Sequence, residues 1–141
     1  MGFITSTLGF RTGLVYFATS LKDFIEQIVR WLKPQGIFAV YYSAFRFDDK
    51  TSIETLKKDG TELALTLRKL NLPYEVIDYT KDHFEHMKHK RIIALEMRDE
   101  FLLNGLEQFL NNVISQSIDM NIPFDEFKEF SSRYIYVVKK L

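Results

Sequence analysis

The fold is decided by one stretch of the chain, residues 31–42, which reads WLKPQGIFAVYY. Pro34 cannot continue a helix, so a helix that reaches Trp31 must end there. Gly36 can take the left-handed turn that often follows a helix. Residues 37–42 are then a continuous run of strand-forming apolar residues, which is typical of a strand buried on both faces, as in a parallel sheet covered by helices. A helix, a tight turn and a buried strand form half of a βαβ unit and predict an α/β fold.

A helix should precede this turn. Ser20 offers a hydroxyl to the first free N–H groups, and Asp23 places a carboxylate at the positive end of the helix. The apolar residues that follow recur at helical spacing and form one stripe. Its members are Leu21, Phe24, Ile25, Ile28 and Leu32. We therefore expect the helix that ends at Trp31 to lie on the sheet through this stripe.

The rest of the chain alternates between helical and extended patterns. In residues 1–13, Ile4, Thr5 and Thr7 favour a strand. Further along we expect a helical segment over 51–70 divided at Gly60, a strand over 74–79, helices over 81–117, a short helix after Pro123 and a strand over 134–138. An unbroken helix over 81–117 would be about 55 Å long. A bend near Asn104-Gly105 is therefore expected.

Composition excludes several classes of protein. The chain has 141 residues, which suits one domain, and 46% hydrophobic with 15% aromatic residues, which excludes intrinsic disorder. Lys+Arg and Asp+Glu are 19 each, so a general nucleic-acid-binding role is not expected. No apolar run is long enough to span a membrane. The absence of cysteine excludes disulfides and thiolate zinc sites and fits a cytoplasmic location.

Two stretches carry a resemblance to a known family. Residues 31–42 resemble the passage into strand five of class I S-adenosylmethionine-dependent methyltransferases, where the usual wording is L-K-P-G-G before an apolar strand; Gln35 replaces the first glycine. Residues 14–17, LVYF, are similar to the stretch after strand four of small-molecule methyltransferases. The resemblance covers roughly residues 14–140. It implies a partial Rossmann-like sheet with flanking helices and a helical insertion before the last strand, S-adenosylmethionine as cofactor and a small-molecule substrate.

One departure from the family is large. The family holds its cofactor mainly through a glycine-rich turn after strand one, where glycine lets the backbone approach the ligand. This chain has no G-x-G motif, and Met1 stands about where strand four should be. We therefore expect the C-terminal half of a methyltransferase, truncated before strand four. The alternative is a non-catalytic remnant that serves as a dimeric interaction module.

The candidate pocket residues follow two strands. Tyr41, Tyr42, Ser43 and Arg46 end the central strand and enter the next loop. Ligands of open α/β sheets bind outside the carboxyl ends of strands. Tyr42 could stack on a substrate, and Arg46 could hold an anionic group. The resemblance also places Tyr16 and Phe17 against the cofactor or substrate. In the alternative reading, the aromatic residues fill the core and Arg46 is solvated.

His83 is the candidate catalytic residue. With Phe84 it resembles a His-aromatic pair of related small-molecule methyltransferases, which implies a substrate-side base. His83, His86 and His89 are spaced by three, but at this spacing they fan around a helix and basic residues follow at 88–91, so no metal site is expected. That basic cluster is short and balanced by nearby acids, which again argues against nucleic-acid binding. A solvated helix face is the alternative for the histidines.

We expect residues 1–141 to form a single domain in which the insertion, about residues 81–132, acts as a substrate lid. The family's sheet places strand four beside strands one and five, so without strand one an apolar edge would be open to pairing. Zero net charge gives little repulsion. We expect a homodimer that pairs edge to edge through residues 1–17. Alternatively, residues 1–13 fold back and cap the edge within one chain.

Overall fold

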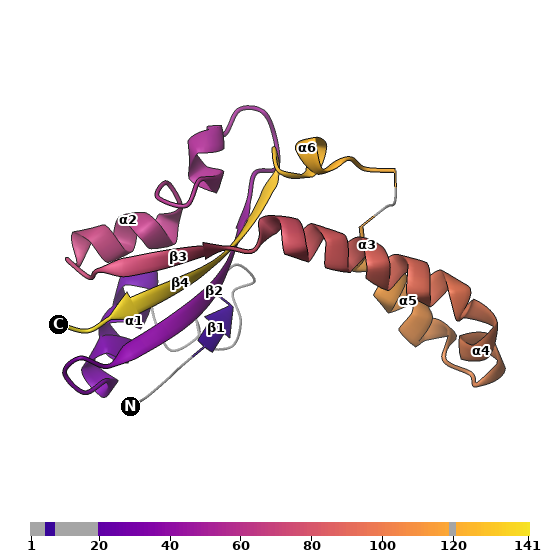
Figure 1. Ribbon diagram of the computed structural model, residues 1–141, viewed down its shortest axis with the longest axis horizontal. Helices are drawn as coiled ribbons and strands as arrows, with labels where there is room; N and C mark the ends of the chain where they lie inside the picture. The colour runs from indigo at the N-terminus through magenta and orange to yellow at the C-terminus, as the bar shows by residue number, and fades with distance from the viewer. Residues whose placement is uncertain (1–4, 8–19, 119–120) are drawn as a thin grey trace. The chain divides into compact units, whose positions relative to one another are not determined.

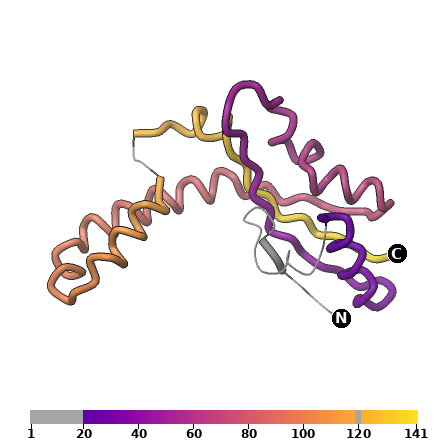
Figure 2. Tube along the Cα trace, turned by 180° about the vertical axis from the view of Figure 1, so that it is seen from behind, coloured from indigo at the N-terminus to yellow at the C-terminus, as the bar shows by residue number. Residues whose placement is uncertain are grey.

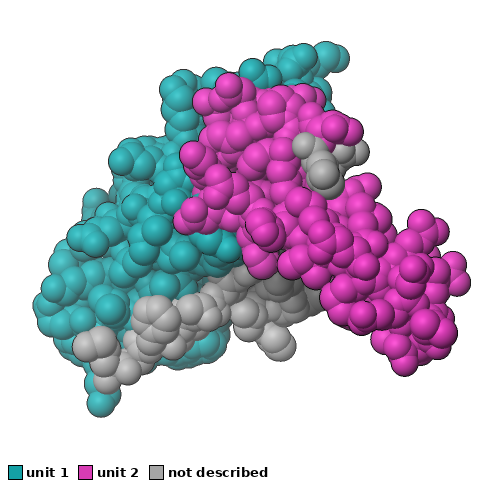
Figure 3. Space-filling view, turned by 45° about the vertical axis from the view of Figure 1, so that its right-hand side comes forward, with its two compact units in different colours: residues 1–79, 129–141 teal, residues 80–128 magenta. Residues whose placement is uncertain are grey.

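The computed structural model describes residues 5–7, 20–118 and 121–141 of the chain, with only the backbone described at residues 5–7. Its contacts divide the chain into two compact units (Figure 3). The first unit, which we call the sheet unit, comprises residues 1–79 and 129–141. The second, the helical unit, comprises residues 80–128 and is inserted into the first along the chain. Among the described residues, no helix is long and apolar enough to cross a bilayer.

The sheet unit is built on a mixed sheet of four strands (Figure 1). The strands are β1 (Thr5–Thr7), β2 (Ile37–Phe45), β3 (Tyr74–Asp78) and β4 (Ser131–Lys139). Their order is β1-β2-β4-β3; β1 is parallel to β2, and β4 is antiparallel to both of its neighbours. The expected α/β fold with a partial sheet is confirmed. The described sheet is parallel only at β1 and β2, because β4 returns between β2 and β3.

Helix α1 (Leu21–Trp31) begins and ends as the sequence predicts. The Ser20 hydroxyl accepts a hydrogen bond from the Asp23 N–H at 3.1 Å. The turn after the helix differs from the prediction: Gln35, with φ 66°, is left-handed, and Gly36 is not. Position 36 requires glycine for a different reason: a Cβ there would lie 2.7 Å from the Lys33 carbonyl oxygen, which is too close.

One face of the sheet is covered by α1 and α2 (Glu62–Lys69). The predicted division of residues 51–70 at Gly60 is confirmed, since a 3₁₀ helix, η2 (Ile53–Leu56), precedes Gly60 and α2 follows it. The core joins side chains of both helices to alternate side chains of β2 and β4. It includes Ile25, Ile28, Phe38, Val40, Leu63, Leu67, Tyr136 and Val138.

The helical unit contains α3 (Thr80–Glu96), α4 (Arg98–Leu103), α5 (Glu107–Ser115) and α6 (Phe124–Phe127). The expected bend is confirmed at Gly105, whose φ is 69°, and a further break lies at Met97. Helices α3 and α5 run side by side as a hairpin (Figure 2). At the start of α3, Phe84 packs on Phe124 and Phe127, with ring centroids 5.3 and 5.1 Å away.

Candidate functional site

The two candidate residues at the end of β2 lie on opposite faces of the sheet. Tyr42 packs against the core cluster that α1 and α2 cover, together with Phe38 and Val40. Because side chains alternate along a strand, Tyr41 and Ser43 lie on the other face, which we call the second face. The structure therefore separates Tyr42 from Ser43.

Tyr42 is held within the packing of the helix-covered face. Its ring makes an edge contact with Tyr136, with centroids 6.2 Å apart and planes at 81°. Burial, assisted by the negative charge of Glu62, raises the pKa of Tyr42 to about 12. The phenol therefore stays neutral at neutral pH and contributes packing in this position.

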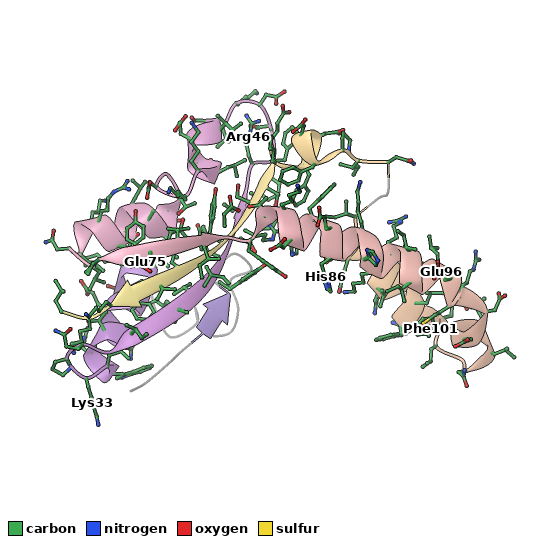
Figure 4. The ribbon with its side chains drawn as sticks, viewed as in Figure 1. Lys33, Arg46, Glu75, His86, Glu96 and Phe101 are labelled. Carbon is green, nitrogen blue, oxygen red and sulfur yellow. The ribbon has the colours of Figure 1, made fainter. Side chains whose placement is uncertain are left out.

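Arg46 ties two loops of the sheet unit together (Figure 4). Its Nε donates to the Glu129 carbonyl oxygen at 2.8 Å, and Nη1 donates to the Thr51 carbonyl oxygen at 3.2 Å. The guanidinium carbon also lies 5.1 Å from the centre of the Phe130 ring. These contacts fix the loop after β2 to the residues before β4, so the charge of Arg46 is already engaged by backbone and aromatic partners.

The second face gathers a polar and aromatic cluster at the carboxyl end of β2. Tyr41 meets Tyr79 edge to face, with ring centroids 5.7 Å apart. Arg133, from β4, is buried and lies directly across the ladder from Ser43. Its guanidinium lies 4.7 Å from the centre of the Phe45 ring. We call Tyr41, Ser43, Phe45, Tyr79 and Arg133 the second-face cluster.

Arg133 sets the electrostatics of this cluster. It donates hydrogen bonds to the Ser131 hydroxyl and to the Ser132 carbonyl oxygen, the latter at 3.1 Å. Burial lowers its pKa, while the neighbouring Tyr41 raises it. Burial raises the pKa of Tyr41, and the charge and hydrogen bond of Arg133 oppose that rise. The result is a neutral phenol beside a buried cation that is hydrogen-bonded within the cluster.

Ser43 adds an unused polar group to the cluster. Only 3% of its surface is exposed, and its Oγ finds no hydrogen-bond partner among the described residues. A buried hydroxyl without a partner costs free energy. The Ser43 hydroxyl is therefore a buried polar group with unused hydrogen-bonding capacity beside Arg133.

Sequence reasoning missed Phe45, Tyr79 and Arg133. Arg133 is brought to Ser43 by the β2–β4 register, and the Tyr79 N–H donates to the Arg133 carbonyl oxygen at 2.9 Å. One signal in the sequence could have found Arg133. Side chains alternate between the two faces of a strand, so a strand over residues 131–137 places Arg133 on the same face as Ile135 and Val137. Tyr16 and Phe17 lie outside the described residues.

The three histidines separate within the helical unit. The His83 ring stacks on Phe127 with centroids 6.5 Å apart. His86 and His89 instead line an open groove of about 640 Å³ between α3, α4 and α5. His86 is labelled in Figure 4, as is Phe101 from the groove's other end. Among the described residues, no group of three or more His, Asp or Glu is arranged to hold a metal ion.

The described glycines do not form a cradle for a nucleoside. Gly36 precedes β2 at its amino end, Gly60 lies before α2, and Gly105 lies between α4 and α5. None follows the carboxyl end of a strand, where a glycine-rich turn would meet a bound nucleotide. The second-face cluster offers side-chain donors, an acceptor oxygen and aromatic rings, which fit the substrate side of a pocket.

Comparison with known proteins gives the fold. No protein-family model and no curated protein matches the chain. Among solved structures, phosphoethanolamine N-methyltransferase 2 from Haemonchus contortus, in complex with phosphomonomethylethanolamine and S-adenosylhomocysteine, is similar at a TM-score of 0.67 and 12% identity. A second structure of that enzyme, with S-adenosyl-L-methionine, gives 0.66 and 12%. A protein described as a sarcosine dimethylglycine methyltransferase from Galdieria sulphuraria gives 0.57 and 14%.

These matches cover 98% of this chain in each case, but 33%, 33% and 52% of the three solved chains. The chain thus spans a third to a half of the length of these structures, as a C-terminal half would. The expected resemblance is confirmed at the level of the fold. The chain has the fold of part of an S-adenosylmethionine-dependent methyltransferase.

Proposed function

We propose that this chain is the substrate-side part of an S-adenosylmethionine-dependent methyltransferase that acts on a small molecule. The observation that carries the proposal is the second-face cluster at the carboxyl end of β2, in a chain with this fold. In open α/β sheets, that end of a strand is where ligands bind. A cytoplasmic location is part of the proposal, and the absence of cysteine fits it. We expect neither nucleic acid nor a membrane as partner.

The cluster residues have complementary roles. Ser43 Oγ accepts from or donates to a polar group of the ligand, and Arg133 holds an anionic or acceptor group. Tyr41 and Tyr79 form the aromatic wall against which the ligand lies. One of the similar structures holds phosphomonomethylethanolamine, a small anionic molecule, and a buried cation suits a substrate of that class.

S-adenosylmethionine supplies an electrophilic methyl group when it is bound. The contribution of this chain is to orient the substrate and to keep water away from it, because methyl transfer depends on in-line alignment more than on acid–base work. His83 remains the candidate base in this proposal. The helical insertion, about residues 81–132, would act as the lid that excludes water.

A second function is favoured by a different observation. The chain has no G-x-G motif, and the described glycines form no nucleoside cradle. A methyltransferase-like chain without that turn would serve as a non-catalytic interaction module, in keeping with the predicted homodimer through residues 1–17.

Isothermal titration with S-adenosylmethionine and with S-adenosylhomocysteine separates the two functions. Micromolar binding of either molecule by this chain would overturn the interaction module. The substrate-side proposal is tested separately, by the binding of a substrate analogue. Small anionic amines are then titrated into the wild type, Ser43→Ala and Tyr42→Phe. Ser43→Ala should weaken their binding, whereas the matched change at Tyr42, on the helix-covered face, should leave it unchanged.

A further inference from the structure

The helical unit leaves much of its apolar surface uncovered. Among its described residues, the buried apolar side chains are Phe84, Ala94 and Leu110. In contrast, Ile93 is 48% exposed and Phe109 is 55% exposed. A hairpin of two helices is too small to bury a core of its own, and small helical units commonly obtain the missing cover from a partner.

Three of the exposed large apolar side chains, Ile93, Met97 and Phe109, line the groove between the three helices. Its apolar lining comes from Ile93 and Ala94 of α3, Met97 at the break between α3 and α4, Phe101 of α4, and Phe109 and Val113 of α5. A helix that lay in this groove would contact all three. The natural occupant of such a groove is an amphipathic helix that presents aliphatic residues at helical spacing.

The charge pattern along the hairpin favours a second copy of this chain as the occupant. Between residues 81 and 91 the chain has four basic residues and two acidic ones, together with three histidines. Between residues 92 and 107 it has four acidic residues and one basic one. The first part of the hairpin, residues 81–91, therefore has an excess of basic residues, and residues 92–107 have an excess of acidic ones; Glu85 and Lys90 of the first part line the groove itself. A second hairpin of the same kind, laid antiparallel, matches opposite charges at both ends.

Other occupants fit this pattern less well. A membrane-surface helix carries an excess of Lys and Arg on its polar face, whereas residues 80–128 contain six Lys and Arg against nine Asp and Glu. Nucleic acid is disfavoured by the same balance. A parallel second copy would bring the acidic ends together.

We propose that the groove of the helical unit, centred on Ile93, is a homodimer interface in which α3 packs antiparallel against α3 of a second copy. The two hairpins then form a four-helix bundle with twofold symmetry. Within α3, helical spacing from Ile93 places His86 and His89 near the same face as Ile93, and Glu96 at its edge. Across the twofold axis, His89 would lie next to Glu96 of the second copy. This interface is separate from residues 1–17 and does not depend on methyltransferase activity.

Cysteine cross-linking tests the geometry directly, because the chain has no cysteine of its own. Ile93 lies close to the twofold axis, so Ile93→Cys should give a disulfide-linked dimer under mild oxidation. Leu95→Cys is the matched control, since Leu95 is 43% exposed on the same helix but does not line the groove. In a mixture of His89→Cys and Met97→Cys chains, the mixed dimer should exceed both like pairs, which an antiparallel arrangement requires.

Sedimentation equilibrium at micromolar concentration gives the second measurement. The wild type should be a dimer, and Ile93→Glu should weaken association about tenfold or more. Leu95→Glu should leave it unchanged, and circular dichroism should show that both variants keep their helix content. A monomeric wild type overturns the proposal. A dimer that survives Ile93→Glu also overturns it, because the interface would then lie in another part of the chain. Equal cross-linking at positions 93 and 95 contradicts it as well.

Discussion

The Tyr136 hydroxyl lies 2.6 Å from Thr61 Oγ1, and this contact belongs to a chain of hydrogen bonds whose direction can be assigned. The Tyr136 hydroxyl also lies 2.6 Å from the Lys58 carbonyl oxygen, which can only accept. Tyr136 therefore gives its proton to Lys58, and Thr61 must donate to Tyr136. Thr61 Oγ1 in turn accepts from the Ala64 N–H at the start of α2. The chain fastens the start of α2 to the central strand β4.

Removing the Tyr136 hydroxyl should therefore destabilise the sheet unit. Tyr136→Phe leaves the Thr61 hydroxyl and the Lys58 carbonyl without this partner, at a cost of about 1–3 kcal/mol in the free energy of unfolding. Urea unfolding measures the loss. Tyr74→Phe is the matched control: the Tyr74 hydroxyl bonds Asp59 and Arg68, which are surface side chains that water can satisfy. Equal losses in the two variants would contradict the assignment.

The stripe of α1 makes a second prediction about stability. Ile28 is 2% exposed and lies in the core cluster. Ile28→Ala should lower the free energy of unfolding by about 2–5 kcal/mol, because it removes buried methyl groups and leaves a cavity. Trp31→Ala is the control on the same helix, since Trp31 is largely exposed, and it should cost much less. A loss at Ile28 below about half a kcal/mol would mean that its side chain is not buried.

Helix α1 was predictable because its signals are local. The Ser20 cap, the apolar stripe and Pro34 all lie within fifteen residues of one another, and each has a fixed physical meaning. The helices before the last strand, in residues 81–117, were predictable because the helical spacing of their apolar residues is also a local signal.

The second-face cluster was not predictable in this way. Residues 37–42 are apolar throughout, so the sequence carries no alternation to show which of Tyr41 and Tyr42 faces the helices. The proximity of Ser43 to Arg133 depends on the register between β2 and β4. That register is fixed by packing between segments about ninety residues apart, which single-sequence periodicity does not report.

Glycines 60 and 105 should respond differently to substitution. A Cβ at Gly60 would lie 1.9 Å from the Glu54 carbonyl oxygen, so Gly60→Ala and Gly60→Asn should both destabilise the sheet unit, by about 1–3 kcal/mol or more. Gly105 has φ +69° and open space around it. Gly105→Ala should cost about 1–2 kcal/mol from backbone strain, and Gly105→Asn should cost less because Asn tolerates this conformation.

Urea unfolding followed by circular dichroism compares the four variants. The comparison of Asn with Ala is the informative control, because Asn relieves strain at a left-handed position but not a steric overlap. If Gly60→Asn lowered the free energy of unfolding less than Gly60→Ala does, the constraint at Gly60 would be backbone conformation and not space.

Alkaline pH should destabilise the folded chain through its tyrosines. Burial raises the pKa of Tyr42 to about 12 and raises those of Tyr41, Tyr134 and Tyr136 as well. In the unfolded chain these phenols ionise near pH 10. The folded state therefore holds more protons than the unfolded state above that pH, and stability must fall as pH rises. The contribution of the neutral, buried phenols to the free energy of unfolding is fully present below about pH 10. The contribution of Tyr42 is lost between about pH 10 and 12.

The measurement is the midpoint of urea unfolding at a series of pH values from neutral to alkaline, at constant ionic strength. Tyr42→Phe should lower the stability at neutral pH only slightly, because Phe keeps the ring contact with Tyr136. It should also make the decline above pH 10 less steep, since one group that must ionise on unfolding is gone. A decline of the same slope in both proteins would show that Tyr42 ionises equally well in the folded chain, and would place its hydroxyl in contact with water.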